Sequence, residues 1–347
     1  MMNPDSKSPL NTQLKNPQIE GYQFTWLDWF CLWYPPGWLI LFNRHWQHYH
    51  SEPDGWKWFE YCLFLIPLGF YLALFIRWLR LGFRSPGTNN NQEFNPNYQK
   101  LFRQEILAPI VKHYFQAQLH QLENLPIANI SREEPVIVIM NHAGMSFPWD
   151  FITLAYLLSE KYNWIVQPLA GTALFDHALM EWWLPSGWSK ILGGVRADRN
   201  SFKAAIQEHK NVLYAPEGLR GPMKGWAKRY QLQTFDISFV QLSENYQVPI
   251  LPIICIGNEK LHPFTINVRW LQRLLKMPFF PLSPLIILFF LFPSMGVWAM
   301  RSQLNYFIQP VENVNLNDSE LDNKRSAAYQ KAQKLREYMQ MQINERI

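Results

Sequence analysis

The residues of this 347-residue chain best suited to chemistry are a histidine and an aspartate, His142 and Asp150. They follow the apolar run PVIVIM (135–140), which predicts a buried strand, and Asp150 stands where a helical pattern begins. An imidazole can accept a hydroxyl proton near neutral pH when a carboxylate holds its other nitrogen in the right tautomer. The pair therefore predicts a general base supported by an acid. The alternative is that both residues are structural, with His142 as a polar residue at the end of a strand and Asp150 as the N-cap of the following helix.

Two later segments, GGVRADRNSF and YAPEGLRG, carry side chains suited to an anionic substrate. These candidate substrate-binding residues are Arg196, Arg199, Glu217, Gly218 and Arg220. A guanidinium group is planar and matches phosphate oxygens, although a solvated basic loop or a turn closed by its own salt bridge would use the same residues. Because the second segment ends a predicted strand, we expect Glu217 and Arg220 to emerge at the same sheet edge as His142.

With VPILPI, a predicted buried strand whose two prolines suit a sheet edge or the wall of an apolar groove, these segments resemble the four ordered blocks of the glycerolipid acyltransferase superfamily. That superfamily includes the glycerol-3-phosphate and lysophosphatidate acyltransferases. The matching positions are Asn141, His142 and Asp150, then Gly194 to Arg199, then Pro216, Glu217, Gly218 and Arg220, and finally Val248 to Ile253. The resemblance covers about residues 135–311.

Two departures indicate a divergent branch of that family. Four residues normally separate the histidine from the aspartate, but seven do here, and Phe147 stands where the aspartate is usually found. A longer loop, kinked at Pro148, must therefore bring Asp150 back to the imidazole. The Lys-Gly pair that usually follows the third block is missing near 234–236, although Lys224 and a following glycine lie nearby.

The resemblance implies direct transfer of a fatty acyl chain from acyl-CoA or an acyl-carrier protein to the hydroxyl of a glycerolipid. His142 would be the base, Asp150 its partner, and Arg199 and Arg220 would hold the phosphate of lysophosphatidate or another lysophospholipid. The acyl donor is a co-substrate, so we expect no bound cofactor and no metal. The alternatives are ester synthesis on a neutral lipid alcohol such as diacylglycerol or an isoprenoid alcohol, a serine hydrolase, and a non-enzymatic lipid-binding protein.

Ser146 carries the hydrolase alternative, because it stands midway between His142 and Asp150. Pro148 interrupts a helix there, and no Gly-x-Ser-x-Gly turn occurs to expose a nucleophile, so we do not favour it. The cluster HWQHYH (45–50) has three histidines but no recognised metal-ligand spacing.

Composition favours a protein at a membrane surface. Hydrophobic residues make up 48% of the chain and aromatics 16%, against 17% charged. The net charge is +5, and residues 190–230 hold nine Lys or Arg against three acidic residues, which fits an anionic partner. No zinc, RNP or basic-helix pattern accompanies that charge, so we expect no nucleic acid. Three distant cysteines predict no disulfide framework and favour a reducing compartment.

The elements that position these residues divide the chain into four predicted parts. They are a polar tail (1–23), a membrane-associated aromatic hairpin (24–86), a linker (87–98) and a catalytic domain (99–347) with an apolar membrane-dipping insertion (about 275–301) and a C-terminal helix (about 318–345). One apolar stretch of the hairpin contains prolines that would bend a helix, and the other is barely long enough to span a bilayer. We therefore expect the hairpin to lie in the membrane–water interface. Arginines after it place the catalytic domain on the cytoplasmic side.

The sequence of the catalytic domain predicts an α/β fold, with a mostly parallel central sheet covered by helices. Short β-rich runs alternate with helical patterns through it. The predicted strands are 135–140, 164–169, 211–215, 249–256, 265–270 and 304–311.

Overall fold

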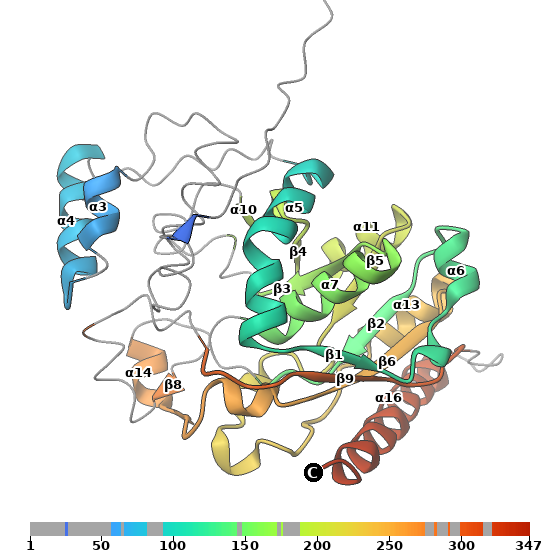
Figure 1. Cartoon of the computed structure of the whole chain (residues 1–347). Helices are drawn as coiled ribbons and strands as arrows, with labels where there is room; N and C mark the ends of the chain where they lie inside the picture. The colour runs from blue at the N-terminus through green and yellow to red at the C-terminus, as the bar shows by residue number, and fades with distance from the viewer. Residues whose placement is uncertain are drawn as a thin grey trace, which may run out of the picture.

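A computed structural model describes most of the predicted catalytic domain and part of the chain before it (Figure 1). The described residues are 25–26, 57–63, 66–81, 93–143, 148–171, 175, 188–274, 281–282, 291, 299–314 and 321–347. Residues 27–56 of the predicted hairpin, which include the HWQHYH cluster, lie outside them, as do Ser146 and most of the insertion at 275–301. Within the described residues, no helix combines the length and apolar character needed to cross a bilayer.

A seven-stranded sheet in the order β1-β9-β6-β2-β5-β3-β4 forms the centre of the domain. Its strands are β1 Gln118–His120, β2 Ile137–Met140, β3 Val166–Ala170, β4 Val195–Arg196, β5 Asn211–Tyr214, β6 Ile250–Ile256 and β9 Asn305–Ile308. All neighbours run parallel except β6 and β9, so β1 and β9 form an antiparallel flank. The predicted mostly parallel sheet covered by helices is confirmed, while β1 and β4 were not predicted.

The run TINVRW is not a strand of this sheet. Only β7 (Ile266–Asn267) is extended there, and it pairs with β8 (Pro281–Leu282) in a separate two-stranded ribbon. Helix α14 (Arg269–Leu274) begins two residues later. The predicted strand over 265–270 is therefore wrong in its second half, where α14 begins. Trp270 and Leu274 of that helix are four residues apart, a spacing that places them on one helical face.

The strand β2 is buried on both faces, which explains its unbroken apolar sequence. Val138 and Met140 pack in the core on one side of the sheet, with α7 (Trp149–Tyr162) and the π-helical segments η1 (Arg103–Leu107) and η2 (Ile110–Tyr114). Ile137 and Ile139 pack in the core on the other side. Side chains alternate with a period of two along a strand, so one short run supplies both layers.

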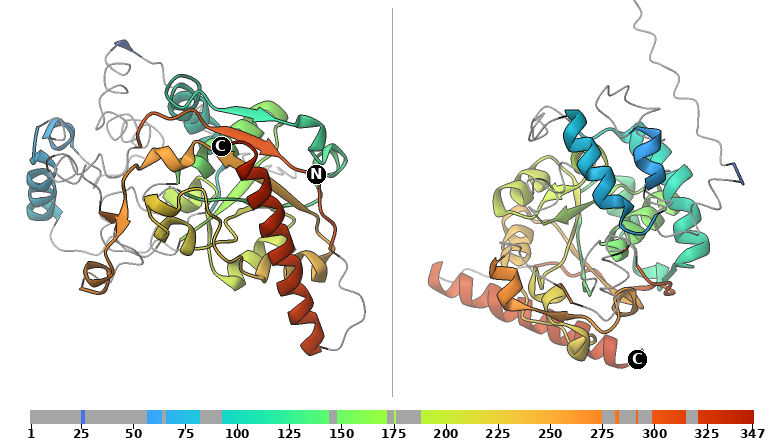
Figure 2. Two further views of the ribbon diagram at one scale, coloured as in Figure 1. Left: turned by 90° about the horizontal axis from the view of Figure 1, so that it is seen from below. Right: turned by 90° about the vertical axis from the view of Figure 1, so that its left-hand side faces the viewer.

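Helices cover both faces of the sheet. The second core includes α11 (Arg199–Gln207), α13 (Ser238–Tyr246) and α16 (Leu321–Asn344), and α16 runs along the outside of the domain in Figure 2. The shorter helices are α5 Pro96–Phe102, η3 Leu122–Asn124, α6 Ile127–Ser131, α10 Trp188–Ile191, α12 Arg220–Met223, η4 Trp226–Lys228 and η5 Asn258–Leu261. The apolar residues that recur along α16 at helical spacing are buried: Ala328, Ala332, Leu335, Met339 and Ile343.

Two helices before the domain, α3 (Trp58–Leu63) and α4 (Gly69–Leu81), pack against each other. Arg80 binds the buried carboxylate of Glu60 through two nitrogens, each 2.9 Å from a carboxylate oxygen. Ala73 of α4 is buried in the core cluster that also contains α7. The helix pair is thus attached to the domain on one side, and much of its remaining apolar surface is exposed.

The fourth sequence block forms β6, an interior strand and not a sheet edge. Proline lacks the N–H that a ladder requires, so an interior position needs an explanation. The β6–β9 ladder starts at Ile253 and Ile308, and Pro252 lies one residue before it. Its carbonyl accepts from the Gln309 amide just after β9 ends, at 2.9 Å. The missing N–H therefore removes one bond only at the end of that ladder, where β9 has already ended.

Gly257 closes β6 in a conformation that a larger residue would resist. Its φ is +104°, and a Cβ there would lie 2.0 Å from the Gln303 carbonyl oxygen. We expect Gly257→Ala to lower the free energy of unfolding by about 2 kcal/mol or more, because both backbone strain and overlap oppose it. Gly171→Ala is the matched control, since nothing lies within 4 Å of its added Cβ. Equal urea-unfolding free energies for the two variants would contradict this.

Candidate active site

His142 and Asp150 are in direct contact. His142 lies two residues beyond β2, and Asp150 is the second residue of α7. The imidazole Nδ1 is 2.9 Å from Asp150 Oδ2 and 3.1 Å from Oδ1. The carboxylate is fully buried, whereas the imidazole remains 16% exposed. The longer spacing in the sequence is therefore compatible with contact, because Asp150 enters from the first turn of a helix.

Three neighbours hold Asp150 in place. The Asn258 side-chain amide donates to Oδ2 at 3.1 Å, and the Phe151 main-chain amide donates to Oδ1 at 3.0 Å. The Tyr306 hydroxyl donates to the Asp150 carbonyl oxygen at 2.7 Å. Both carboxylate oxygens thus have a second donor besides the imidazole, which a buried charge requires.

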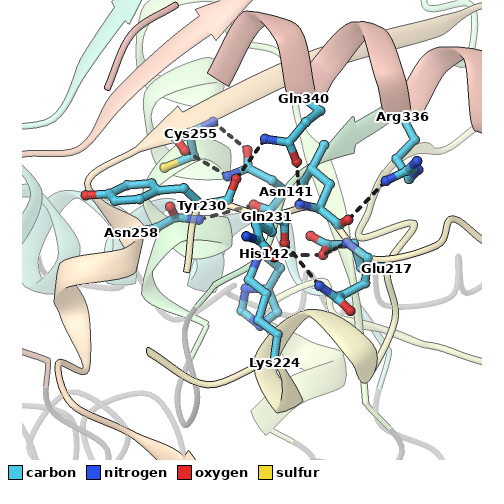
Figure 3. Close-up of polar contacts among 12 residues, drawn as sticks. Asn141, His142, Glu217, Lys224, Tyr230, Gln231, Cys255, Asn258, Arg336 and Gln340 are labelled. Atoms are coloured by element: carbon cyan, nitrogen blue, oxygen red, sulfur yellow. Dashed lines mark hydrogen bonds and ion pairs between the residues drawn. The ribbon is translucent and has the colours of Figure 1, made fainter. Parts of the chain in front are cut away.

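The residue before the histidine joins β2 to β6. The Asn141 amide oxygen accepts from the Cys255 N–H and its nitrogen donates to the Cys255 carbonyl, both at 2.8 Å. The Asn258 amide also donates to the Asn141 carbonyl at 3.2 Å (Figure 3). Asn258 therefore connects the backbone beside the imidazole with the carboxylate that the imidazole binds.

Glu217 lies on another side of His142, in the turn after β5. It is 1% exposed, and its Oε2 accepts from the Gln233 amide at 2.7 Å. The Lys224 ammonium lies 3.6 Å from the same oxygen and is itself nearly buried. Among the described residues, Glu217 Oε1 has no hydrogen-bond partner. A Cβ on Gly221 would lie 2.7 Å from the His142 carbonyl, so glycine permits this turn to pack directly against the histidine.

Helix α16 supports the segment that reaches Glu217 (Figure 3). The Gln340 side chain accepts from the Leu232 amide at 2.7 Å and donates to the Tyr230 carbonyl at 2.9 Å. Arg336 donates to the Leu232 carbonyl at 3.2 Å. This segment leads directly into Gln233, so the C-terminal helix fixes the amide that binds Glu217.

The electrostatic environment favours a charged histidine beside a charged aspartate. Burial lowers the pKa of His142, but the Asp150 carboxylate, its hydrogen bond and the nearby Glu217 outweigh burial and raise the pKa above its usual value. Burial works against ionised Asp150, but His142, Asn258 and the Phe151 amide hold the pKa of Asp150 below its usual value. Burial raises the pKa of Glu217, and Lys224 opposes the rise.

The predicted arginines lie apart from this cluster. Arg199 lines a cleft of about 510 Å³ between α11 and α13, and Arg220 lines an adjoining cleft of about 500 Å³. The two clefts share Asp236 and Arg325, and neither His142 nor Asp150 lines them. Arg196 lies 3.8 Å from Asp198 and over the Phe175 ring. The structure therefore brings His142, Asp150 and Glu217 together and places Arg199 and Arg220 in two adjoining clefts.

Sequence reasoning did not assign roles to four residues around the pair: Lys224, Asn258, Glu259 and Tyr306. Asn258 and Glu259 could have been found, because they follow a predicted parallel strand at the edge where β2 also ends. Tyr306 carries no such signal, since it lies in the middle of an apolar strand. Among the described residues, no group of three or more His, Cys, Asp or Glu side chains has an arrangement that could hold a metal ion.

Glu259 gives this region a measurable pH dependence. It is 4% exposed and its Oε2 accepts from the Gly257 amide at 3.1 Å, yet burial raises its pKa to about 7 from 4.5. Between those values the folded protein binds more protons than the unfolded chain, so the free energy of unfolding falls as pH rises.

Because glutamine does not ionise, we expect Glu259→Gln to remove this loss of stability at higher pH. Its free energy of unfolding relative to the parent should rise between pH 5 and pH 8 by about 3 kcal/mol. Urea unfolding at both pH values measures the difference, and Glu337→Gln on the exposed face of α16 is the matched control. A pH-independent difference between Glu259→Gln and the parent would contradict the assignment.

Known proteins resemble this chain at low identity. An uncharacterised protein of Mycobacterium tuberculosis (strain H37Rv) is 26% identical over 195 residues, which are 55% of this chain and 51% of the relative. An uncharacterised protein of Mycobacterium leprae is 26% identical over 202 residues, 55% of this chain and 50% of the relative. The chain therefore spans about half the length of the curated relatives that it matches.

The solved structure of the 1-acyl-sn-glycerophosphate (LPA) acyltransferase PlsC from Thermotoga maritima aligns with 81% of this chain and 92% of its own, at 13% identity and a TM-score of 0.38. Residues 116–256 match the sequence model of the family described as Acyltransferase. This range contains all four sequence blocks, from Asn141 to the strand β6. Over this range the chain is accordingly similar to the Acyltransferase family.

Proposed function

We propose that this protein transfers a fatty acyl chain from a thioester to the hydroxyl group of a glycerolipid, with His142 as general base. The observation that carries the proposal is the contact of 2.9 Å between His142 Nδ1 and the buried Asp150 carboxylate, inside the region that matches the acyltransferase family. A base oriented in this way, at the end of a parallel strand, suits proton abstraction.

The chemistry needs no covalent intermediate on the protein. When Nδ1–H donates to Asp150, the Nε2 lone pair is available to the acceptor hydroxyl. As His142 takes that proton, the acceptor oxygen bonds to the thioester carbonyl carbon. The C–S bond then breaks, and the imidazolium returns the proton to the departing thiolate. Such a base contributes on the order of 10²- to 10⁴-fold, and positioning supplies much of the rest.

Glu217 and Lys224 supply two further groups beside the base. The buried Glu217 Oε1 lacks a partner among the described residues, so it suits a hydrogen bond from a hydroxyl of the acceptor. The Lys224 ammonium lies close enough to lower the pKa of His142. A buried cation there stabilises the negative charge that develops on the thioester oxygen.

The acceptor is lysophosphatidate or another lysophospholipid, held through its phosphate, and the donor is acyl-CoA or an acyl-carrier protein. Arg199 and Arg220 line adjoining clefts, and neither forms an ion pair with a described carboxylate. Their charge is therefore available to an anion. Arg196 and Gly218 complete the proposed substrate-binding set. A neutral alcohol such as diacylglycerol or an isoprenoid alcohol is the second candidate, favoured by the lengthened His-to-Asp spacing.

We place the protein at a membrane, with the catalytic domain on the cytoplasmic side. Leu72, Phe75 and Leu79 of α4 are each at least half exposed, and Trp58 of α3 is 62% exposed. Aromatic and aliphatic side chains of this kind favour the bilayer interface. Nucleic acid is not a proposed partner.

We expect His142→Ala to lose acyl transfer by about 10³-fold or more, because no neighbouring group replaces the base. Purified parent and variant are incubated in detergent with labelled acyl-CoA and a panel of lysophosphatidate, other lysophospholipids, diacylglycerol and isoprenoid alcohol. Chromatography separates the products. Equal product formation by both proteins would rule out the mechanism.

Ser146→Ala is the matched control in the same assay. It should retain transfer, whereas a serine hydrolase would lose its activity and label Ser146 with a fluorophosphonate probe. A non-enzymatic lipid-binding protein would form no product with any acceptor.

A second test uses pH. His142 must be neutral to act as a base, so kcat/KM of the parent should fall as pH drops through the raised pKa of His142. Asp150→Asn removes the largest influence that raises this pKa, so the acid limb should move to lower pH. The plateau rate should also fall by about 10²-fold or more. An unmoved acid limb would show that Asp150 does not tune the group being titrated.

A further inference from the structure

A second concentration of exposed apolar side chains lies on the catalytic domain itself. Phe264, Ile266, Trp270 and Leu274 are each between 58% and 69% exposed, and they fall within eleven residues. We call these four side chains the 264–274 patch. Soluble surfaces rarely gather such large apolar side chains without a contact to make.

The segment that carries the 264–274 patch also carries positive charge. Lys260, Arg269 and Arg273 are exposed beside it. Glu259 is the only acidic residue between 257 and 274 in the sequence, and it is buried. Exposed aromatic and aliphatic side chains in the same segment as exposed Lys and Arg match the interface of a membrane with anionic lipids.

The 264–274 patch is joined to the candidate active site through one turn. The Phe264 ring contacts the Trp226 ring at 5.2 Å, and the Trp226 amide donates to the Thr265 carbonyl at 2.8 Å. A Cβ on Gly225 would lie 3.2 Å from that carbonyl, so the two segments approach closely. Lys224 immediately precedes Gly225 in the sequence, and its ammonium group pairs with Glu217 beside His142.

The orientation of the domain is consistent with one shared surface. In Figures 1 and 2, α14 and β8 project from the same side of the domain as α3 and α4. A flat bilayer can touch both only if they lie on one side. The 264–274 patch therefore belongs to an element on the same side of the domain as the apolar helices α3 and α4.

We infer that the 264–274 patch docks the catalytic domain directly onto an anionic lipid surface, in addition to the contact proposed for α3 and α4. This interface places the turn that carries Lys224 against the bilayer, so a lipid substrate can reach His142 without crossing water. The inference concerns membrane contact alone, so it can be tested whether or not acyl transfer occurs.

The first measurement is partition of the full-length protein into vesicles of phosphatidylcholine with 30% phosphatidylglycerol, used at about half-maximal binding. The variant F264S/I266S/W270S/L274S should partition at least tenfold more weakly than the parent. The matched control is L122S/I127S/M341S/I347S, four exposed apolar residues elsewhere on the domain, and it should partition like the parent. Arg269→Gln with Arg273→Gln should weaken binding to these vesicles by roughly tenfold, and by much less on pure phosphatidylcholine.

The second measurement does not depend on affinity. Leu274→Cys is labelled with an environment-sensitive fluorophore in a Cys31→Ser, Cys62→Ser background, and Met341→Cys is labelled as the control. Vesicles should shift the emission to the blue and brominated lipid should quench it at position 274 alone. Equal responses at both positions, or serine variants that partition alike, would overturn the proposal. A change from dimer to monomer in the patch variant, without loss of lipid binding, would instead identify a second copy as the occupant.

Discussion

The buried carboxylate of Asp150 is the constraint on which the rest of the site depends. A fully desolvated charge is stable only when each oxygen has donors, and removing one donor leaves the others unable to compensate. Here the imidazole, the Asn258 amide and the Phe151 main-chain amide supply them. These donors come from three separate segments of the chain, so the folded sheet must bring β2, α7 and the end of β6 to one point.

That requirement explains why the spacing between histidine and aspartate can vary. The contact depends on where α7 begins relative to the end of β2, not on the number of residues between them. Tyr306 holds the first turn of α7 from β9, through the Asp150 carbonyl. Asn141 fixes the end of β2 against β6 through two hydrogen bonds to Cys255. With both ends fixed, the connecting loop needs only sufficient length.

Sequence patterns predicted the parts of the fold that local hydrophobicity determines. The strands at 137–140 and 250–256 are apolar on both faces, and α16 repeats apolar residues at helical spacing, so each was identifiable alone. Strands β1 and β4 are only three and two residues long and carry too little pattern. The contact between His142 and Asp150 was expected from the two residue types at a strand end and a helix start and from the family resemblance, although the spacing departs from the family's pattern. The placement of Arg199 and Arg220 in adjoining clefts depends on long-range packing against α16 and could not be predicted.

The site lies between two surfaces of different character. On one side, the turn at Lys224 packs against the apolar segment that carries Phe264, and on another, Arg199 and Arg220 line two polar clefts that also contain Asp236 and Arg325. A molecule with a fatty chain and an anionic headgroup matches both surfaces only in one orientation. On the proposed function, its chain faces the side of Phe264 and its phosphate faces the arginines. The hydroxyl between them then meets His142, whose position is already fixed by Asp150. On this proposal, the segments that carry Phe264, Arg199 and Arg220 orient the substrate, whereas Asp150 at the start of α7 orients the base.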